Sequence, residues 1–399
     1  MKILAIETSC DETAISIIEA EIKSLGESFE GGEIGEIKIL SQVINSQIEI
    51  HKEFGGVFPN LAKREHSKNI VPVCDLAFKE AKIESEKLKL GELEVGEIKE
   101  MLQHEPELFE RIVPWLKEVG CPKIDLIAVT EGPGLEPALW VGINFARVLA
   151  KVWQKKIVAI NHMEGHLVSA LLQHQDETKV VLPKLEFPAV ALLVSGGHTQ
   201  IVQVEAWGKY KVIGETQDDA VGEAFDKVAR LLDLEYPGGP KISQLAKQAE
   251  EERLMLETKF PRPMLHSGDL NFSFSGIKTA VRYYIEKNFG GGKLPELTES
   301  DKKKIARDFE DSAVEVLTKK IARAADKVGA QNVLAGGGVI ANAKLRRELK
   351  KIIDVPIWTP YLKYSTDNAT MIAVAALLKL SYDPSPFADN LKADGNKSL

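Results

Sequence analysis

The 399-residue chain has few cysteines, no long apolar run and no excess of positive charge. Its three cysteines (Cys10, Cys74 and Cys121) are odd in number, widely spaced and without a CxxC pair, which predicts reduced thiols in a cytoplasmic protein. No apolar run reaches the roughly 18 residues that span a bilayer, so no membrane association is expected. The formal net charge of −8 means that a nucleic-acid partner needs a local basic patch or basic partner proteins.

Two histidines with helical spacing stand in the segment Asn161-His162-Met163-Glu164-Gly165-His166. It follows an apolar, strand-like run and opens a predicted helix that Asn161 can cap. Residues four apart lie on one helix face, so two neutral imidazoles can bind one cation there. The alternative is a pair of polar residues at a helix start. Glu164 lies off the shared face, and the zinc-protease pattern His-Glu-x-x-His is absent.

A strand, a polar turn and a returning strand are predicted twice. Residues 1–18 contain the first, whose turn Glu7-Thr8-Ser9-Cys10-Asp11-Glu12-Thr13 either faces a phosphate or metal or is an ordinary hairpin turn. Residues 188–204 contain the second, with the turn Ser195-Gly196-Gly197-His198. Because α/β material follows each hairpin, an internal duplication is predicted. We expect domains over 1–185 and 186–399, charged insertions near 20–38 and 83–120, and a disordered tail from about 384.

Glycine-rich turns between strands and helices suggest places where an anion can approach the backbone. Gly132-Pro133-Gly134 is either such a turn or a tight βα corner, and Gly196-Gly197 is bare enough for phosphate. The run from Gly336 to Asn342 resembles a nucleotide-approach turn, with Asn342 placed to bond an adenine or ribose. Gly222, inside a predicted helix, indicates a close neighbour such as a ligand.

Three other segments have two interpretations each. Asp367, at a helix start, is either an N-cap or the third ligand of a two-histidine metal site. Residues 271–279 form either a plain strand or a substrate-facing edge with Lys278. The basic patch is either a solvated helix face or a phosphate contact; its members are Lys52, Lys63, Arg64 and Lys68.

Taken together and in order, these motifs resemble those of the TsaD family, the bacterial transferases of tRNA threonylcarbamoyladenosine synthesis, which are related to the Kae-type subunit of archaeal and eukaryotic complexes. The resemblance covers nearly the whole chain. It is carried by Glu7–Thr13, Gly132–Leu135, Asn161–His166, Ser195–Gln200, Asp218–Lys227, Tyr236–Pro240, Phe272–Gly276 and Gly336–Asn342.

The resemblance implies an α/β fold of the actin/Hsp70/sugar-kinase (ASKHA) type, with two duplicated domains and a central cleft. It implies transfer of the threonylcarbamoyl group from threonylcarbamoyl-AMP to N6 of adenosine 37 in tRNAs reading ANN codons, forming t6A. The implied partners are tRNA, a TsaB-like paralogous subunit and a TsaE-like ATPase.

The resemblance also implies roles for individual residues. His162, His166 and Asp367 correspond to the ligands of one Fe²⁺ or Zn²⁺ ion per subunit. Asp11 and Glu12 are expected to support catalysis, with Asp11 as one candidate proton acceptor. The adenylate site corresponds to Leu193, Val194, Ser195, Gly196, Gly197, Asp226, Gly239 and Asn342.

Some positions depart from the family pattern, namely Asn60, Glu136-Pro137 and Ser365, and these bear on partner docking and tRNA fit. Three other functions remain to be weighed. A metallopeptidase would place a glutamate to activate water beside the metal. A kinase-like ASKHA protein would hydrolyse ATP without needing the His-His-Asp set. A non-catalytic scaffold would resemble the TsaB-like paralogue and would not need that set either.

Overall fold

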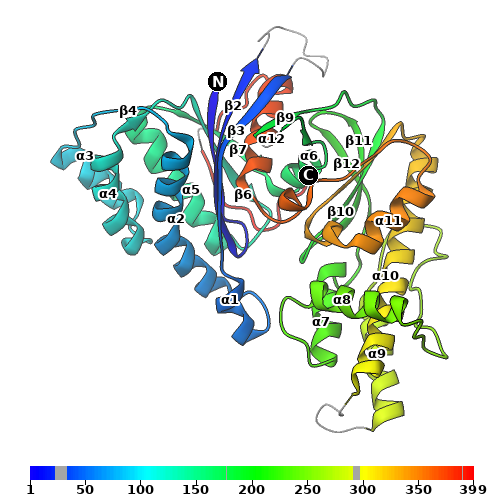
Figure 1. The fold of residues 1–399 in the computed structure, drawn as a ribbon. Coiled ribbons are helices and arrows are strands. Elements are labelled where there is room, and N and C mark those ends of the chain that lie inside the picture. The colour runs from blue at the N-terminus through cyan, green and yellow to red at the C-terminus, as the bar shows by residue number, and fades with distance from the viewer. Residues whose placement is uncertain (23–33, 177, 291–296, 389) are drawn as a thin grey trace. The chain divides into compact units, whose positions relative to one another are not determined.

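The computed structural model describes residues 1–22, 34–176, 178–290, 297–388 and 390–399, and the chain forms two compact units (Figure 1). The first comprises Met1–Ile50, Val57–Lys184 and Asp367–Leu399, and the second comprises His51–Gly56 and Leu185–Thr366. Each unit is built of helices around a mixed sheet. Among the helices of these described ranges, none combines the length and the apolar character that crossing a bilayer requires.

The sheet of the first unit has the strand order β7-β6-β1-β2-β3-β9-β8. Strand β1 pairs antiparallel with β2 and parallel with β6, so the predicted N-terminal hairpin is confirmed. The strands are β1 (Lys2–Glu7), β2 (Glu12–Ile22), β3 (Ile34–Ser46), β6 (Leu126–Gly132), β7 (Lys156–Asn161), β8 (Gln173–His174) and β9 (Lys179–Val181).

Helices cover both faces of this sheet. Successive side chains of a strand point to opposite faces, so each face presents apolar residues to the helices. On one face, Leu4 and Ile6 pack with α2 (Pro59–Ala81) and α5 (Glu136–Trp153). Helix α12 (Ala369–Tyr382) packs against β1, β2, β6 and β7 and also contacts α6 (His162–Ser169). The first ten residues of α12 are all buried, as expected for a helix that is apolar all round.

The charged insertion over 83–120 is part of the scaffold. It contains the short strand β4 (Ser85–Glu86) and the helices α3 (Glu92–Met101) and α4 (Pro106–Val119). Strand β5 (Cys121–Pro122), directly after it, pairs with β4. Leu108, Ile112 and Leu116, which recur at helical spacing, are buried in the same core as α2 and α5. The predicted insertion near 20–38 lies partly in β2 and β3, and its residues 23–33 are outside the described part of the chain.

The sheet of the second unit has the order β12-β11-β10-β13-β14. Its core joins Val190, Leu192 and Val194 of β10 to helices α7 to α11. The strands are β10 (Ala189–Val194), β11 (Thr199–Ala206), β12 (Lys209–Glu215), β13 (Asn332–Gly336) and β14 (Ile357–Trp358). The helices are α7 (Val221–Leu231), α8 (Gly238–Glu251), α9 (Ser275–Phe289), α10 (Glu299–Val328) and α11 (Ala343–Ile352). Among the described residues there are also four short helical segments: α1 (Ile48–His51), η1 (Lys52–Phe54), η2 (Gly338–Ala341) and η3 (Leu362–Tyr364).

The two sheets share one topology. In each, the first strand pairs antiparallel with the second strand of its hairpin and parallel with a strand reached through a long crossover. The order β7-β6-β1-β2-β3 therefore corresponds to β14-β13-β10-β11-β12. The predicted internal duplication is confirmed at the level of strand order.

The compact units differ from the predicted division into 1–185 and 186–399, because residues 367–399 belong to the first unit. The apolar helix α12 needs the sheet of that unit to bury its surface. The sequence predicts disorder from about residue 384, and some of the described residues there contact the first unit. Leu391 is 7% exposed, and the backbone N–H groups of Ala388 and Asp394 donate to the carbonyls of Ile157 and Glu131.

Candidate functional site

The metal-ligand candidates begin at the first turn of α6. Asn161 has an extended conformation, and its side-chain oxygen accepts a hydrogen bond of 2.8 Å from the N–H of Met163. This N-cap, predicted from the sequence, starts the helix at His162. The rings of His162 and His166 then lie one turn apart, with 4.6 Å between centroids and nearly perpendicular planes. The two imidazoles share one side of α6.

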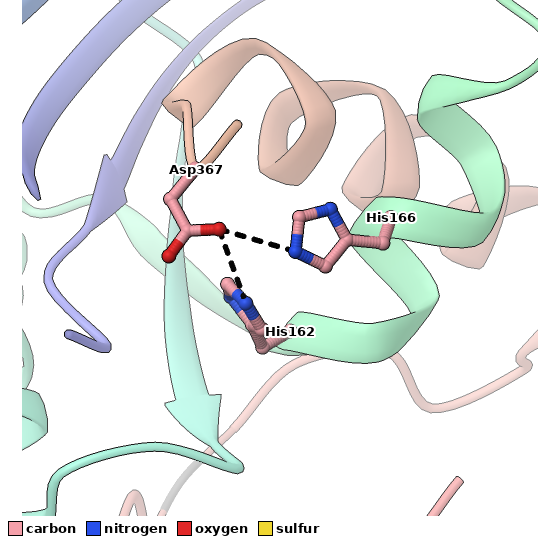
Figure 2. A group of neighbouring side chains, drawn as sticks. All are labelled: His162, His166 and Asp367. Carbon is pink, nitrogen blue, oxygen red and sulfur yellow. Dashed lines mark ion pairs between the residues drawn. The ribbon is translucent and has the colours of Figure 1, made fainter. Parts of the chain in front are cut away.

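Asp367 reaches the two histidines from the segment before α12 (Figure 2). Its Oδ1 atom lies 3.5 Å from Nε2 of His162 and 3.1 Å from Nε2 of His166. The N-cap of α12 is Asn368, whose side chain accepts from the N–H of Met371 at 3.0 Å. Asp367 is therefore not the N-cap, and its carboxylate points to the histidines.

The arrangement fits a divalent transition metal. One ligand atom from each of the three side chains lies within 4.8 Å of the others. Both ring nitrogens of His166 are buried, and neither has a hydrogen-bond partner among the described residues, although Nε2 is close to Asp367. A buried, unsatisfied imidazole is costly unless a ligand satisfies it. Two imidazole nitrogens and one carboxylate oxygen form a donor set typical of zinc and of non-haem iron.

Buried carboxylates favour positive charge at this place. Burial by itself lowers the pKa of His162, but the charges of Asp367 and Glu7 raise it to about 9. Burial raises the pKa of Glu7, yet the charge and hydrogen bond of His162 outweigh it and leave that pKa below its ordinary value. A proton on His162 or a bound cation satisfies the same electrostatic demand.

The acidic turn between β1 and β2 lies within electrostatic reach of Asp367. Burial, followed by the charges of Asp11 and Asp367, raises the pKa of Glu12 well above its usual range. The turn is held by His66 of α2, whose Nε2 donates to the carbonyl of Cys10 at 2.9 Å. Its Nδ1 makes a second hydrogen bond, of 2.7 Å, with the hydroxyl of Thr13. Asp11 and Glu12 thus lie on a clamped turn near the metal-ligand candidates.

Glu164 does not take the role that a metallopeptidase requires. It is buried on α6, and its carboxylate accepts a hydrogen bond of 2.7 Å from the hydroxyl of Tyr382 in α12. The sequence spacing predicts that this side chain leaves the shared histidine face, and its contact with Tyr382 agrees.

In the second unit, the turn after β10 is open. An added Cβ at Gly196 or Gly197 would meet no atom within 4 Å. The turn is held by its own residues, since the N–H of Ser195 donates to the carbonyl of His198 at 2.9 Å. Leu193 and Val194 are buried in β10, and Gly337 of the next turn packs against the carbonyl of Val194 with φ of 94°. This unobstructed backbone suits the approach of an anion.

The other adenylate-site candidates lie on elements that flank this turn. Asp226 of α7 accepts from the N–H of Gly238 at 2.7 Å, and burial raises its pKa despite the N–H groups of Gly238 and Gly239. An added Cβ at Gly239 would meet nothing within 4 Å. Asn342 caps α11 through the N–H of Leu345. Its amide nitrogen donates to Ser243 at 2.9 Å and to Glu310 at 2.7 Å.

Two sequence interpretations need correction in this unit. The close neighbour of Gly222 is backbone, because an added Cβ would meet the carbonyl oxygen of Ser195 at 2.6 Å. The segment 271–279 is not a strand. Only a single bridge joins Phe272 to Thr216, and α9 begins at Ser275, where Asp218 accepts from the N–H groups of residues 274 and 275.

Two further candidates in the first unit are engaged within the protein. The N–H of Gly134 donates to the carbonyl of Gly395 at 3.2 Å, and Leu135 donates to Ser9, so the turn after β6 is a packed corner. The basic residues of α2 in the predicted patch are beside carboxylates, which favours the solvated-face interpretation; the pairs are Lys63 with Glu105, Arg64 with Glu107 and Lys68 with Glu65.

Glu7 lies beside the metal-ligand candidates, although the sequence gives it no individual role. Its buried carboxylate lies 3.0 Å from Nδ1 of His162. In the sequence it is an acidic residue at a strand end, next to a polar turn. The only available signal was its place in the same motif as Asp11 and Glu12.

The duplicated sheets, each opening with a hairpin, define an α/β protein of the ASKHA class. A solved structure of full-length HypF in its phosphate- and nucleotide-bound form shares this fold, with a TM-score of 0.50, 11% sequence identity, and coverage of 97% of this chain and 47% of that one. That similarity concerns the fold alone.

Sequence comparison identifies the family within this class. The family model of tRNA N6-adenosine threonylcarbamoyltransferase, TsaD, matches residues 38–90 and 103–374. The protein of that name from Thermomicrobium roseum is 41% identical over 392 residues, covering 94% of this chain and 91% of that protein. The one from Nitrosospira multiformis is 39% identical over 383 residues, with 95% and 91% covered. The chain belongs to the TsaD family of transferases.

Proposed function

We propose that this chain transfers the threonylcarbamoyl group from threonylcarbamoyl-AMP to N6 of adenosine 37 in tRNAs that read ANN codons, in the cytoplasm. The proposal includes one Fe²⁺ or Zn²⁺ held by His162, His166 and Asp367. Its strongest support is that a member of the TsaD family carries these three side chains within ligand distance of one another.

The metal, when bound, supplies Lewis acidity towards the carbonyl or phosphate oxygens of the adenylate. The protein's part is to hold the ligand atoms in place. The Asn161 cap fixes the first turn of α6, and the Asn368 cap fixes the start of α12, next to Asp367. Each cap joins an asparagine side-chain oxygen to a backbone N–H at a helix start, and so helps to place the ligand atoms next to it.

The adenylate is bound by the open turn of the second unit. In this proposal the phosphate approaches the backbone of Ser195-Gly196-Gly197, which is open at Gly196 and Gly197. Asp226, Gly239 and Asn342 are proposed to bind the nucleoside. The amide nitrogen of Asn342 is already engaged by Ser243 and Glu310. The oxygen of Asn342 already accepts from the N–H of Leu345, so its second lone pair is what it offers to a donor group of the nucleoside.

In the transfer, the N6 amine of the adenosine attacks the carbamoyl carbon, and the bond from that carbon to the AMP oxygen breaks. The amine loses one proton, for which Asp11 is the proposed acceptor. Glu12, whose pKa is raised, favours the protonated form and can donate a hydrogen bond beside it. Because AMP is a good leaving group, no covalent enzyme nucleophile is needed, and alignment supplies much of the acceleration.

We further propose that the chain works with a TsaB-like subunit and a TsaE-like ATPase. The ion-paired state of the basic residues on α2 supports this, because it leaves them less able to hold tRNA phosphates by themselves.

The test is to incubate the purified chain and its TsaB-like and TsaE-like partners with threonylcarbamoyl-AMP and unmodified ANN-decoding tRNA. Threonylcarbamoyladenosine in the digested tRNA is then measured, with His162→Ala and Asp367→Ala beside the wild type. Product that disappears in both variants supports the metal-assisted transfer. Product that persists in both refutes the metal assignment, and no product from the metal-loaded wild type with its partners refutes the function.

A further inference from the structure

A fully buried carboxylate lies behind the metal-ligand candidates. Glu7 ends the strand β1 and is 0% exposed. Its Oε2 lies 3.0 Å from Nδ1 of His162 and accepts a hydrogen bond of 2.6 Å from the hydroxyl of Thr130. Its Oε1 accepts from the N–H of Ser9. The Glu7 carboxylate therefore touches His162 on the side of the ring opposite to Asp367.

This contact decides which ring nitrogen of His162 faces the ligand position. An ionised carboxylate only accepts hydrogen bonds, so Nδ1 of His162 carries a proton and donates it to Glu7. In the neutral ring Nε2 then has its lone pair free, and Nε2 is the atom 3.5 Å from Asp367. A carboxylate behind a histidine ligand also makes the imidazole a stronger electron donor.

Strand pairing and several hydrogen bonds hold Glu7 in its position. Strand β1 is paired on both sides, with β2 and β6, and Thr130 of β6 holds the same oxygen that contacts His162. The Ser9 N–H holds the other oxygen. Because three donors converge on one carboxylate, its orientation does not depend on His162 alone.

We propose that Glu7 is a positioning residue of the metal centre, which fixes the ring and tautomer of His162 and so strengthens the binding of a divalent cation. The inference rests on the proposed function in one respect only, namely that His162, His166 and Asp367 bind a metal. It concerns a residue that contacts a metal ligand, His162, but binds neither the metal nor the substrate and takes no proton from the substrate.

The hydroxyl of Ser9 is the competing partner, since its Oγ lies 3.2 Å from the same Nδ1 atom. A hydroxyl can donate or accept, so it accommodates either tautomer, whereas Glu7 accommodates one. Ser9→Ala is therefore the matched control. It removes a neighbour of the same ring nitrogen and leaves the carboxylate in place.

The experiment measures Zn²⁺ affinity of the full chain by competition with a chromophoric chelator. We expect Glu7→Gln to weaken Zn²⁺ binding by about 10- to 100-fold, the usual effect of losing an outer-shell partner. Ser9→Ala should stay within about threefold of the wild type. The Co²⁺-loaded Glu7→Gln protein should show a changed visible absorption spectrum, a readout that a role confined to folding would not move.

The pair is tested by repeating Glu7→Gln in a His162→Ala background. There the substitution should change Zn²⁺ affinity no further, because its route to the metal is gone. A further loss of similar size would overturn the inference, as would wild-type affinity in Glu7→Gln or a larger loss in Ser9→Ala. If Glu7→Gln does not fold, as judged by circular dichroism, Glu7→Asp keeps the charge but shortens the reach, and the same affinity loss is expected. Should His162→Ala itself bind Zn²⁺ normally, the metal centre fails rather than the role of Glu7 within it.

Discussion

The turns of the two hairpins occupy equivalent places in the duplicated sheets, yet they are built for opposite charges. Between β1 and β2 the turn is rich in side chains, and Glu7, Thr8, Ser9 and Asp11 are buried. Between β10 and β11 the turn is nearly bare, and an added Cβ at Gly196 or Gly197 would meet nothing. Acidic side chains beside two histidines attract a cation, whereas exposed backbone N–H groups attract an anion. Shared topology therefore fixes where a turn lies but not which chemistry it performs.

The largest expected effect comes from removing the carboxylate of Asp367, one of the three metal-ligand candidates. Asp367→Ala should weaken Zn²⁺ binding by more than about 100-fold, since the loss of an outer-shell partner alone costs about 10- to 100-fold. Adenylate binding by the second unit should change much less. Zn²⁺ competition and isothermal titration with a non-reactive adenylate analogue measure the two. Equal losses of both ligands would show that the turns do not act as separate sites.

The second expected effect is a pH dependence of Zn²⁺ affinity that adenylate binding does not share. The pKa of His162 is raised from 6.5 to about 9, so its proton stabilises the metal-free fold below pH 6.5, and this stabilisation is lost as the pH rises through 9. The proton must leave before Nε2 binds a metal. Zn²⁺ affinity should therefore rise by about tenfold per pH unit between pH 7 and 8.5. His162→Ala should flatten this slope, and a slope unchanged in that variant would contradict the assignment of the proton to His162.

Substitutions at two glycines, Gly337 and Gly197, test the turn after β10 as the proposed anion site. Gly337→Ala should destabilise the protein by about 1–3 kcal/mol or more, because φ is 94° and the new Cβ would meet the carbonyl oxygen of Val194 at 2.3 Å. Gly197→Ala has open space and should leave the unfolding midpoint nearly unchanged while it weakens adenylate binding. Urea unfolding and ligand titration separate the two effects. A stable Gly337→Ala protein would show that the close contact between Gly337 and the carbonyl of Val194 is dispensable.

The smallest expected effect compares two N-caps, one in each unit. Asn161→Ala and Asn342→Ala should each cost about 1 kcal/mol, since both side chains accept a hydrogen bond at a helix start. Asn161→Ala should lower Zn²⁺ affinity and spare adenylate binding, and Asn342→Ala should do the reverse. Thermal unfolding with both ligand titrations provides the measurement. If each variant impaired both ligands alike, the caps would act only through global stability.

The features that could be predicted from the sequence are those that depend on residues close together in the chain. The i, i+4 histidine spacing and the Asn161 cap follow from helix geometry alone, and the two hairpins follow from apolar segments on either side of a polar turn. Asp367 is far from His166 in the chain, so it entered as a third ligand only through its residue type and the family resemblance. Nothing in the sequence shows which of two adjacent polar residues, Asp367 or Asn368, caps the helix.

Features that depend on distant contacts were not predictable. Glu7 becomes a partner of His162 because β1 pairs with β6, which in turn pairs with β7, an arrangement that no local pattern reveals. Helix α9 begins at Ser275 because Asp218 caps it from more than fifty residues upstream, which overrides the strand-like alternation before it. The segment after residue 384 is polar and was therefore predicted to be disordered, but its few apolar residues and its backbone groups find partners on the first unit.

The return of Asp367–Leu399 to the first unit also sets an order of events during protein synthesis. The chain emerges from the ribosome amino end first, so the strands of the first sheet and both histidines exist before α12 and Asp367 are made. Until then, the apolar surface that α12 covers stays open to solvent, and only two of the three metal-ligand candidates have been made. The second unit can complete its core during this interval. While the second unit is being translated, the nascent chain therefore exposes an apolar sheet face that is prone to aggregate. This is the stage of synthesis at which a chaperone would be most useful.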